Sequence, residues 1–266
     1  MRGILRLILG LALAVALWQG LVWALALPAF LLPPPGRVLG TLWTSRGLVA
    51  EHAAITAAEI GLGLVLGTGC GVVLAIAMAG WPRLARAVRP VLVFTQTIPV
   101  FALAPLLTLW LGYGMGAKIV MAVLVIFFPV TSAFHDAILA TPRGWIETAR
   151  LMGASPGRIL WHVRLPAALP GLASGLRLAA VYAPIGAVIG EWVGSSGGLG
   201  YLMLLANGRA KTDLMFAALL VLAAMTLALH RAVDALAGRA AARMRGERRL
   251  SARARPRSAS AAPRGR

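Results

Sequence analysis

Residues 145–166 read WIETARLMGASPGRILWHVRLP, and this polar stretch lies between long apolar segments. It is the longest internal segment that cannot cross a bilayer, because charged side chains interrupt it every few residues. The apolar segments on its two sides must therefore be separate membrane spans, joined by a loop that stays in water.

Local sequence signals predict two short helices in this loop. Thr141, followed by a proline, is a helix N-cap signal, and Gly153 is typical of the residue just after a helix end. Ser155, again followed by a proline, repeats the start signal. In the second helix Ile159, Leu160 and Val163 share one face. Pro166 then predicts a stop or a kink.

The composition predicts an all-α, polytopic membrane protein. The chain is 59% hydrophobic and only 13% charged, whereas soluble domains carry about 25% charged residues. Its apolar runs are continuous rather than alternating, which favours helices over a barrel. The one cysteine, Cys70, lies in an apolar run and cannot form an intrachain disulfide. Six runs are long enough to span: Ile4–Leu32, Ala57–Ala79, Val91–Leu111, Ala117–Phe134, Ala168–Val193 and Leu214–His230.

Positive charge predicts that both termini are cytosolic. With the N-terminus inside, 20 of the 26 basic residues lie in inner segments, five in outer segments and Arg177 within a span. The opposite orientation would invert this bias. The stretch around Glu147 is then cytosolic as well.

The first span has a second interpretation. Arg2 and Arg6, the apolar run and the small residues Ala24–Ala26 are similar to a cleavable secretory signal. The run is longer than the usual apolar core of a signal, so an uncleaved span is favoured. Cleavage would leave five spans and every later orientation unchanged.

Three regions follow from these patterns. Residues 1–54 hold the first span and an external segment, with a break at Pro33–Gly36. Residues 55–237 form the membrane core. Residues 238–266 form a cytosolic tail rich in arginine, alanine and serine, expected to be disordered and attracted to anionic lipid. No aromatic residues interleave with its arginines, so no nucleic-acid partner is expected.

The chain has no recognisable catalytic equipment. Its two lysines, Lys118 and Lys211, do not stand in a Gly-rich phosphate-binding loop, and no metal-ligand cluster or nucleophile triad can be assembled. We therefore expect no hydrolysis and no cofactor on this chain.

Polar and helix-bending residues inside the spans are candidates for lining a solute path. The set comprises Gln96, Pro99, Pro184 and Glu191. Glu59 and Arg177 rank below them, and Arg177 can either extend to the membrane interface or pair with a neighbouring carboxylate. Glu191, beside Trp192, can instead be an anchor at the external interface, and prolines are common in spans without a function. The glycine-rich segment Gly194–Tyr201 predicts a tight turn or a close backbone approach.

The polar stretch resembles the EAA loop of ABC importer permeases. Its family pattern is matched in register by Glu147, Ala149, Gly153, Val163, Leu165 and Pro166. Thr148 replaces the first alanine of the pattern, and Val163 replaces the usual isoleucine. The resemblance implies a type I (MetI-like) permease core in which this loop contacts the ATPase.

Residues 55–236 resemble the branch of these permeases that serves nitrate, sulfonate and taurine. The segment Ala183–Gly194 is similar to permeases for pyrimidine precursors of thiamin of the hydroxymethylpyrimidine type. The resemblance implies a multi-pass bacterial inner-membrane protein, a permease homodimer, two ATPase subunits that bind ATP-Mg, and an extracytoplasmic solute-binding protein. An ion-coupled secondary transporter is the alternative, but the few acidic residues lie mostly near span ends.

Overall fold

The computed structural model describes residues 2–253 of the 266, and this part of the chain is helical without a β-strand. The helices are α1 (Arg2–Ala24), α2 (Pro35–Thr44), α3 (Arg46–Gly80), α4 (Pro82–Thr97), α5 (Val100–Leu111), α6 (Met115–Leu139), α7 (Arg143–Leu151), α8 (Pro156–Ile159), a π-helical turn (Leu160–Arg164), α9 (Leu165–Gly194), α10 (Leu199–Gly208) and α11 (Thr212–Arg253).

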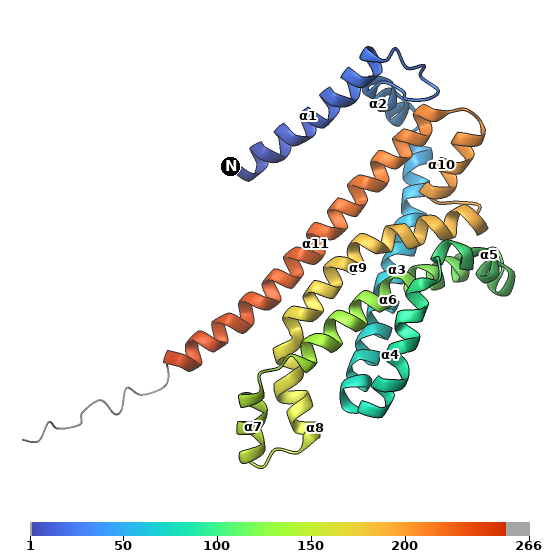
Figure 1. The fold of residues 1–266 in the computed structure, drawn as a ribbon. Coiled ribbons are helices and arrows are strands. Elements are labelled where there is room, and N and C mark those ends of the chain that lie inside the picture. The colour runs from blue at the N-terminus through green and yellow to red at the C-terminus, as the bar shows by residue number, and fades with distance from the viewer. Residues whose placement is uncertain (1, 254–266) are drawn as a thin grey trace, which may run out of the picture.

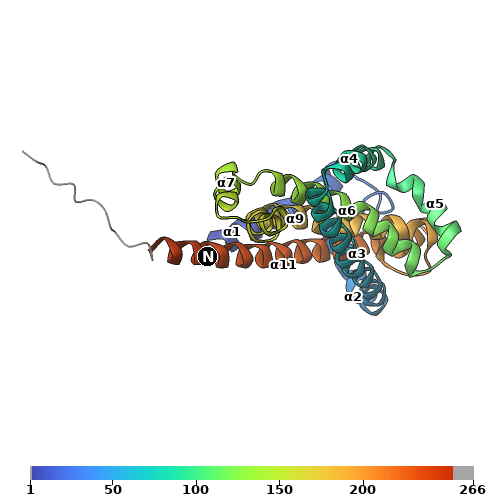
Figure 2. The same ribbon diagram turned by 90° about the horizontal axis from the view of Figure 1, so that it is seen from below.

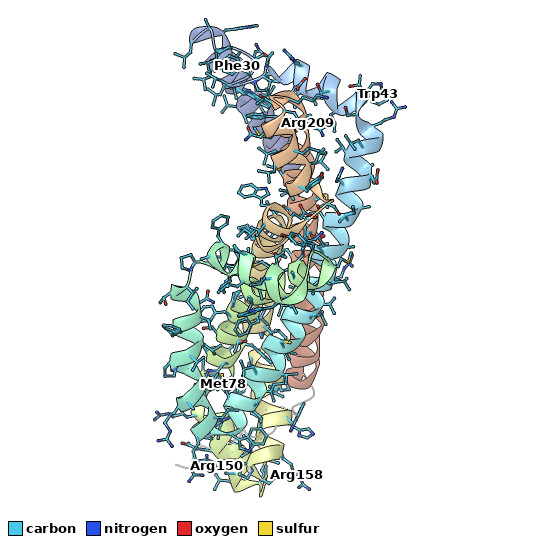
Figure 3. All side chains as sticks on the ribbon, turned by 90° about the vertical axis from the view of Figure 1, so that its right-hand side faces the viewer. Phe30, Trp43, Met78, Arg150, Arg158 and Arg209 are labelled. Atoms are coloured by element: carbon cyan, nitrogen blue, oxygen red, sulfur yellow. The ribbon has the colours of Figure 1, made fainter. Side chains whose placement is uncertain are left out.

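Helices α3, α6 and α9 form the centre of the molecule, and α11 packs along α9 (Figure 1). Helices α7 and α8 lie at one end, called the hairpin end here, and α2 and α10 lie at the other, called the α10 end. Seen along the molecule, α4 and α5 lie to one side of the central helices (Figure 2). The side view separates Arg150 and Arg158 at the hairpin end from Trp43 and Arg209 at the α10 end (Figure 3).

Small residues allow the central helices to approach closely. Gly63, Gly67 and Gly71 recur every four residues on the face of α3 that meets α6. A Cβ atom at Gly67 would lie 2.9 Å from the Cβ atom of Ile126, so only glycine fits there. In lipid the hydrophobic effect does not drive two helices together. Helices there associate through close backbone approach at small residues.

Four of the six expected spans are present as long apolar helices. They are α3, α6, the helix that runs without interruption from Pro156 to Gly194, and the part of α11 up to Arg239. The first expected span, Ile4–Leu32, overlaps α1, which ends at Ala24. The count of six therefore stays a prediction.

The third expected span, Val91–Leu111, is not one helix. Helices α4 and α5 meet at an angle of 98° around Ile98 and Pro99. Proline disfavours helical geometry in the residue before it, and Ile98 is accordingly extended, with φ −80° and ψ 121°. Pro105, by contrast, lies inside α5, so the sharp bend belongs to Pro99 alone.

Two helices extend across the expected region boundaries at residues 54 and 237, and the division into regions stays a prediction. Helix α3 begins at Arg46, so residues 46–54 of the expected external segment are the first part of a long helix. Disorder was expected from Gly238, whereas α11 stays helical through Arg253 because alanine and arginine are strong helix formers. Residues 254–266 of the tail lie outside the described residues.

Pro166 neither ends nor interrupts its helix. The chain widens into one π-helical turn before it, in which the Leu165 N–H bonds the Leu160 carbonyl five residues earlier. Such a turn shifts the hydrogen-bond register where a proline ring would otherwise collide with the preceding turn. The hairpin formed by α7 and α8 is thereby joined to α9 without a break in the helix.

Candidate functional site

The hairpin, Arg143–Ile159, is exposed along its first helix. No residue of α7 is buried, and at its end Leu151 and Met152 are 90% and 82% exposed. Large apolar side chains this exposed on a polar segment are typical of a surface that a partner covers.

Backbone geometry fixes the turn between the two hairpin helices. Gly153 has a φ of +79°, its N–H bonds the Arg150 carbonyl, and the Ala154 N–H bonds the Ala149 carbonyl. This pair of bonds is the Schellman arrangement that ends helices at glycine. The Ser155 Oγ then accepts from the Arg158 N–H at 3.4 Å, which confirms Ser155 as the N-cap of α8.

The expected N-cap of α7 is wrong. Pro142 occupies the cap position, and the Thr141 hydroxyl donates to the Ile138 carbonyl at 2.9 Å instead. Thr141 is 5% exposed, so its side chain faces the end of α6 rather than the start of α7. The sequence signal failed because a threonine side chain has a choice of two nearby backbone partners.

The six residues of the loop motif divide into two groups. Leu165 is buried among α3, α6 and α9 side chains and attaches the hairpin to the core. Glu147, Gly153 and Pro166 are exposed, and Ala149 and Val163 are half-buried. A cavity of about 400 Å³ lies between α7 and the start of α9. Its lining includes three motif residues: Ala149, Val163 and Pro166.

The four path candidates do not share one site. Gln96 lines a cavity of about 440 Å³ between α4, α6 and α9, together with Phe128, Ser132 and Tyr182. Pro99 begins α5 at the sharp bend.

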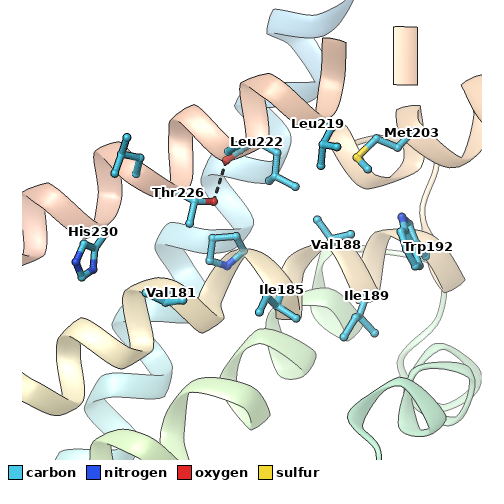
Figure 4. Close-up of a pocket in the computed structure, with 13 residues that line it drawn as sticks. Val181, Ile185, Val188, Ile189, Trp192, Met203, Leu219, Leu222, Thr226 and His230 are labelled. Atoms are coloured by element: carbon cyan, nitrogen blue, oxygen red, sulfur yellow. Dashed lines mark hydrogen bonds between the residues drawn. The ribbon is translucent and has the colours of Figure 1, made fainter. Parts of the chain in front are cut away.

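Pro184 lines a separate groove of about 850 Å³ between α9, α10 and α11 (Figure 4). That groove is almost wholly apolar, and the hydroxyl of Thr226 within it already donates to the Leu222 carbonyl at 2.8 Å. It offers a polar solute little to bind.

Glu191, the fourth candidate, faces neither cavity. It is 1% exposed, and its carboxylate accepts from the Thr56 hydroxyl at 2.6 Å and from the Gly200 N–H at 2.5 Å. The Leu199 N–H bonds the Thr56 Oγ1 at 2.8 Å, so both residues satisfy the first N–H groups of α10. Here the carboxylate serves as the cap of a helix that begins eight residues later in the chain.

The glycine-rich segment provides the space that this arrangement requires. Gly198 has a φ of +108°, and a Cβ atom there would overlap the Glu191 carboxylate. The segment thus combines the tight turn and the close approach expected from its glycines.

Sequence reasoning missed a buried ion pair beside Glu191. The Lys118 Nζ lies 2.5 Å from the Glu59 Oε1, and the two side chains are 7% and 0% exposed. Lys118 is one of the five outer basic residues in the charge count given above. The sequence signal for its burial is that it is a lone lysine at the start of an apolar run. Of the two alternatives for Arg177, the structure shows the ion pair, with the Arg177 Nε 2.6 Å from the Asp234 Oδ1.

The chain matches one sequence family over residues 67–246, described as the binding-protein-dependent transport system inner membrane component. It is 49% identical to a probable ABC transporter permease of Haemophilus influenzae, over 86% of this chain and 92% of that protein. It is 41% identical to the formylaminopyrimidine transport permease ThiX of Halalkalibacterium halodurans, over 65% and 69%. It is 39% identical to the riboflavin transport system permease RibX of Chloroflexus aurantiacus, over 83% of each.

The fold is similar to that of a solved transporter. A chain of the MetNI methionine ABC transporter, in an inward-facing conformation, superposes with a TM-score of 0.59 at 27% identity. The match covers 76% of this chain and 98% of that one.

Proposed function

The chain belongs to the family of binding-protein-dependent transport system inner membrane components and is an ABC importer permease subunit, and we propose that its hairpin is the contact for separate ATPase subunits. The observation that carries this proposal is the hairpin's exposure. Leu151 and Met152 extend into solvent from a short helix in which no residue is buried.

The hairpin is connected to the core by one continuous helix. The helix from Pro156 to Gly194 is continuous, so a displacement of the hairpin moves α9 with it. Helix α9 also forms one wall of the cavity that contains Gln96. In a homodimer with cytosolic termini, closure of the ATPases on ATP-Mg would draw the two hairpins together and open the cavity outward. An extracytoplasmic binding protein would then release its solute into it.

We further propose that the solute is a small, neutral heteroaromatic compound, such as a pyrimidine precursor of thiamin. The cavity around Gln96 contains the rings of Phe128 and Tyr182 for stacking, and the amide of Gln96 and hydroxyl of Ser132 for hydrogen bonds. No arginine, lysine or histidine is among its described lining residues, whereas a sulfonate or taurine would need a cationic partner. The relatives that transport formylaminopyrimidine and riboflavin favour the same class.

Co-purification tests the coupling role. Gly153→Trp would force a bulky side chain into left-handed backbone geometry at the hairpin turn, so the ATPase should no longer co-purify while the permease still inserts. Gly208→Trp is the matched control, because a Cβ atom at either glycine meets open space. Normal ATPase stoichiometry with Gly153→Trp would contradict the proposal.

Uptake by cells that express the complete transporter tests the solute class. Excess unlabelled hydroxymethylpyrimidine should compete with labelled formylaminopyrimidine, and excess taurine should not. Competition by taurine alone would move the solute to the sulfonate branch and leave the coupling proposal unaffected.

A further inference from the structure

A further cavity lies between α3 and the hairpin, and it is called the arginine cavity here. Its volume is about 200 Å³. The end of α3 lines one side of it, and the end of α7, the following turn and the start of α8 line the other. Two charged residues, Arg150 and Arg164, are among its lining residues. The arginine cavity shares no lining residue with the cavity of about 400 Å³ that contains Ala149, Val163 and Pro166.

The charge of the arginine cavity is positive and unbalanced. No acidic residue is among its described lining residues, and the ion pairs of the described chain include neither Arg150 nor Arg164. The Arg164 Nε is buried and has no hydrogen-bond partner among the described residues. A guanidinium nitrogen can only donate, and a buried donor without an acceptor is costly. The arginine cavity therefore offers two guanidinium groups to an anion.

The size of the arginine cavity limits what can enter it. Apart from the arginines, its lining is small or apolar and comprises Ala79, Gly80, Ala154, Pro156, Gly157, Ile159 and Leu160. A space of about 200 Å³ admits a small anionic group but not a helix, which is about 10 Å across with its side chains. Arginine forms its strongest hydrogen bonds with carboxylate and phosphate oxygens, so the anion belongs to one of these two classes.

The position of the arginine cavity favours phosphate. The apolar helix α3 ends at Gly80, a lining residue, and the next residue, Trp81, is 66% exposed. Exposed tryptophan is typical of the headgroup layer of a membrane. Arg83 and Arg86 follow, both exposed on α4, and basic residues directly beside a span attract anionic lipid. Figure 3 shows Met78, near the end of α3, on the side of the molecule toward Arg150.

We propose that the arginine cavity binds the phosphate group of an anionic phospholipid. The phosphate oxygens accept hydrogen bonds from the Arg164 Nε and from the guanidinium group of Arg150. The acyl chains extend from the cavity into the bilayer beside α3. The bound headgroup neutralises two arginines and connects the hairpin to the end of α3 at the membrane surface.

Native mass spectrometry of the full-length permease in detergent measures this binding. The first molecule of dioleoylphosphatidylglycerol should bind more tightly than dioleoylglycerol, which has the same acyl chains and no phosphate. Its dissociation constant should rise about tenfold in Arg164→Gln and in Arg150→Gln, as expected for the loss of one charged hydrogen bond. Arg158→Gln is the matched control, because Arg158 is exposed on α8 and does not line the cavity. It should change the dissociation constant less than about twofold.

Two results would overturn the phosphate site. Equal weakening in all three variants would mean that surface charge alone attracts the lipid, and equal affinity for the two lipids would mean that only the acyl chains bind. The thermal unfolding midpoint of each variant without lipid shows that it is folded. Arg150 is exposed, so Arg150→Gln tests the site even if Arg164→Gln does not fold.

Inorganic phosphate distinguishes the two sources of the anion. It should leave the unfolding midpoint of the wild type unchanged, whereas dioleoylphosphatidylglycerol should raise it. If inorganic phosphate raises the midpoint of the wild type but not that of Arg164→Gln, and the lipid does not, the occupant is free phosphate and the lipid assignment is wrong. These measurements need neither the ATPase nor the solute, so their failure would leave the proposed coupling role in place.

Discussion

At the α10 end, charged side chains are buried and bonded to one another, whereas at the hairpin end apolar side chains extend into solvent. Glu191 is 1% exposed and Glu59 is 0% exposed, while Leu151 is 90% exposed. The α10 end is nearly complete in itself: among the carboxylate oxygens of Glu59 and Glu191, only the Glu59 Oε2 has no hydrogen-bond partner among the described residues. The hairpin end is incomplete, because the apolar side chains of Leu151 and Met152 remain exposed. A difference of this kind separates a part that maintains the fold from a part that receives a partner.

The largest expected effect is at the α10 end. Glu191→Ala removes the acceptor of two buried donors, the Thr56 hydroxyl and the Gly200 N–H, so we expect a loss of about 2–6 kcal/mol in the free energy of unfolding, about 1–3 kcal/mol for each donor left without a partner. Thermal unfolding in detergent measures it. Glu51→Ala, at an exposed position of α3, is the control. It should change the free energy of unfolding by about 0.5 kcal/mol or less. Equal midpoints for both variants would remove the contrast between the two ends.

A smaller loss is expected at the turn that leads into α10. Gly198→Ala introduces a Cβ atom at a φ of +108° and against the Glu191 carboxylate, which should destabilise by about 1–3 kcal/mol. Gly208→Ala, in open helical surroundings, should be neutral or stabilising. An unchanged midpoint for Gly198→Ala would mean that the turn can relax away from Glu191.

At the hairpin end the effect should fall on the partner and not on the fold. Leu151→Ser should leave the free energy of unfolding within about 0.5 kcal/mol, because the side chain is exposed and packs on nothing that stabilises the chain. The amount of ATPase recovered with the permease should fall. A lower unfolding midpoint with normal ATPase recovery would reverse the proposed division of roles.

The smallest effect is expected from the tail. Deletion of residues 246–266 should leave solute uptake unchanged, because the basic tail is expected to bind only anionic lipid. Uptake by the truncated and full-length transporters can be compared at equal permease levels. Loss of uptake would assign the tail a part in transport.

Local signals predicted the hairpin well. Gly153 and Ser155 act through backbone geometry within a few residues, so the sequence alone places the turn and the start of α8. Continuous apolar length likewise predicted six spans, four of which are present as long apolar helices among the described residues. Where a side chain could choose between local partners, as Thr141 does, the prediction failed.

Long-range contacts were beyond sequence reasoning. Glu191 was predicted to line a path because an acidic residue in a span suggests function, but its partners, Thr56 and Gly200, come from another helix and from the far side of a turn. The Glu59–Lys118 pair joins α3 to α6 across 59 positions. Pairings of this kind depend on how the helices pack, which no local pattern contains.

Site-specific photocrosslinking tests the central claim most directly, that the hairpin is the surface where the ATPase binds. A photoreactive phenylalanine analogue replaces Met152 at the hairpin end or, as a control, Trp43 at the α10 end; these side chains are 82% and 71% exposed. If the hairpin is the surface that binds the ATPase, a covalent ATPase adduct should form from position 152 and none from position 43. An adduct from position 43, with none from position 152, would contradict it.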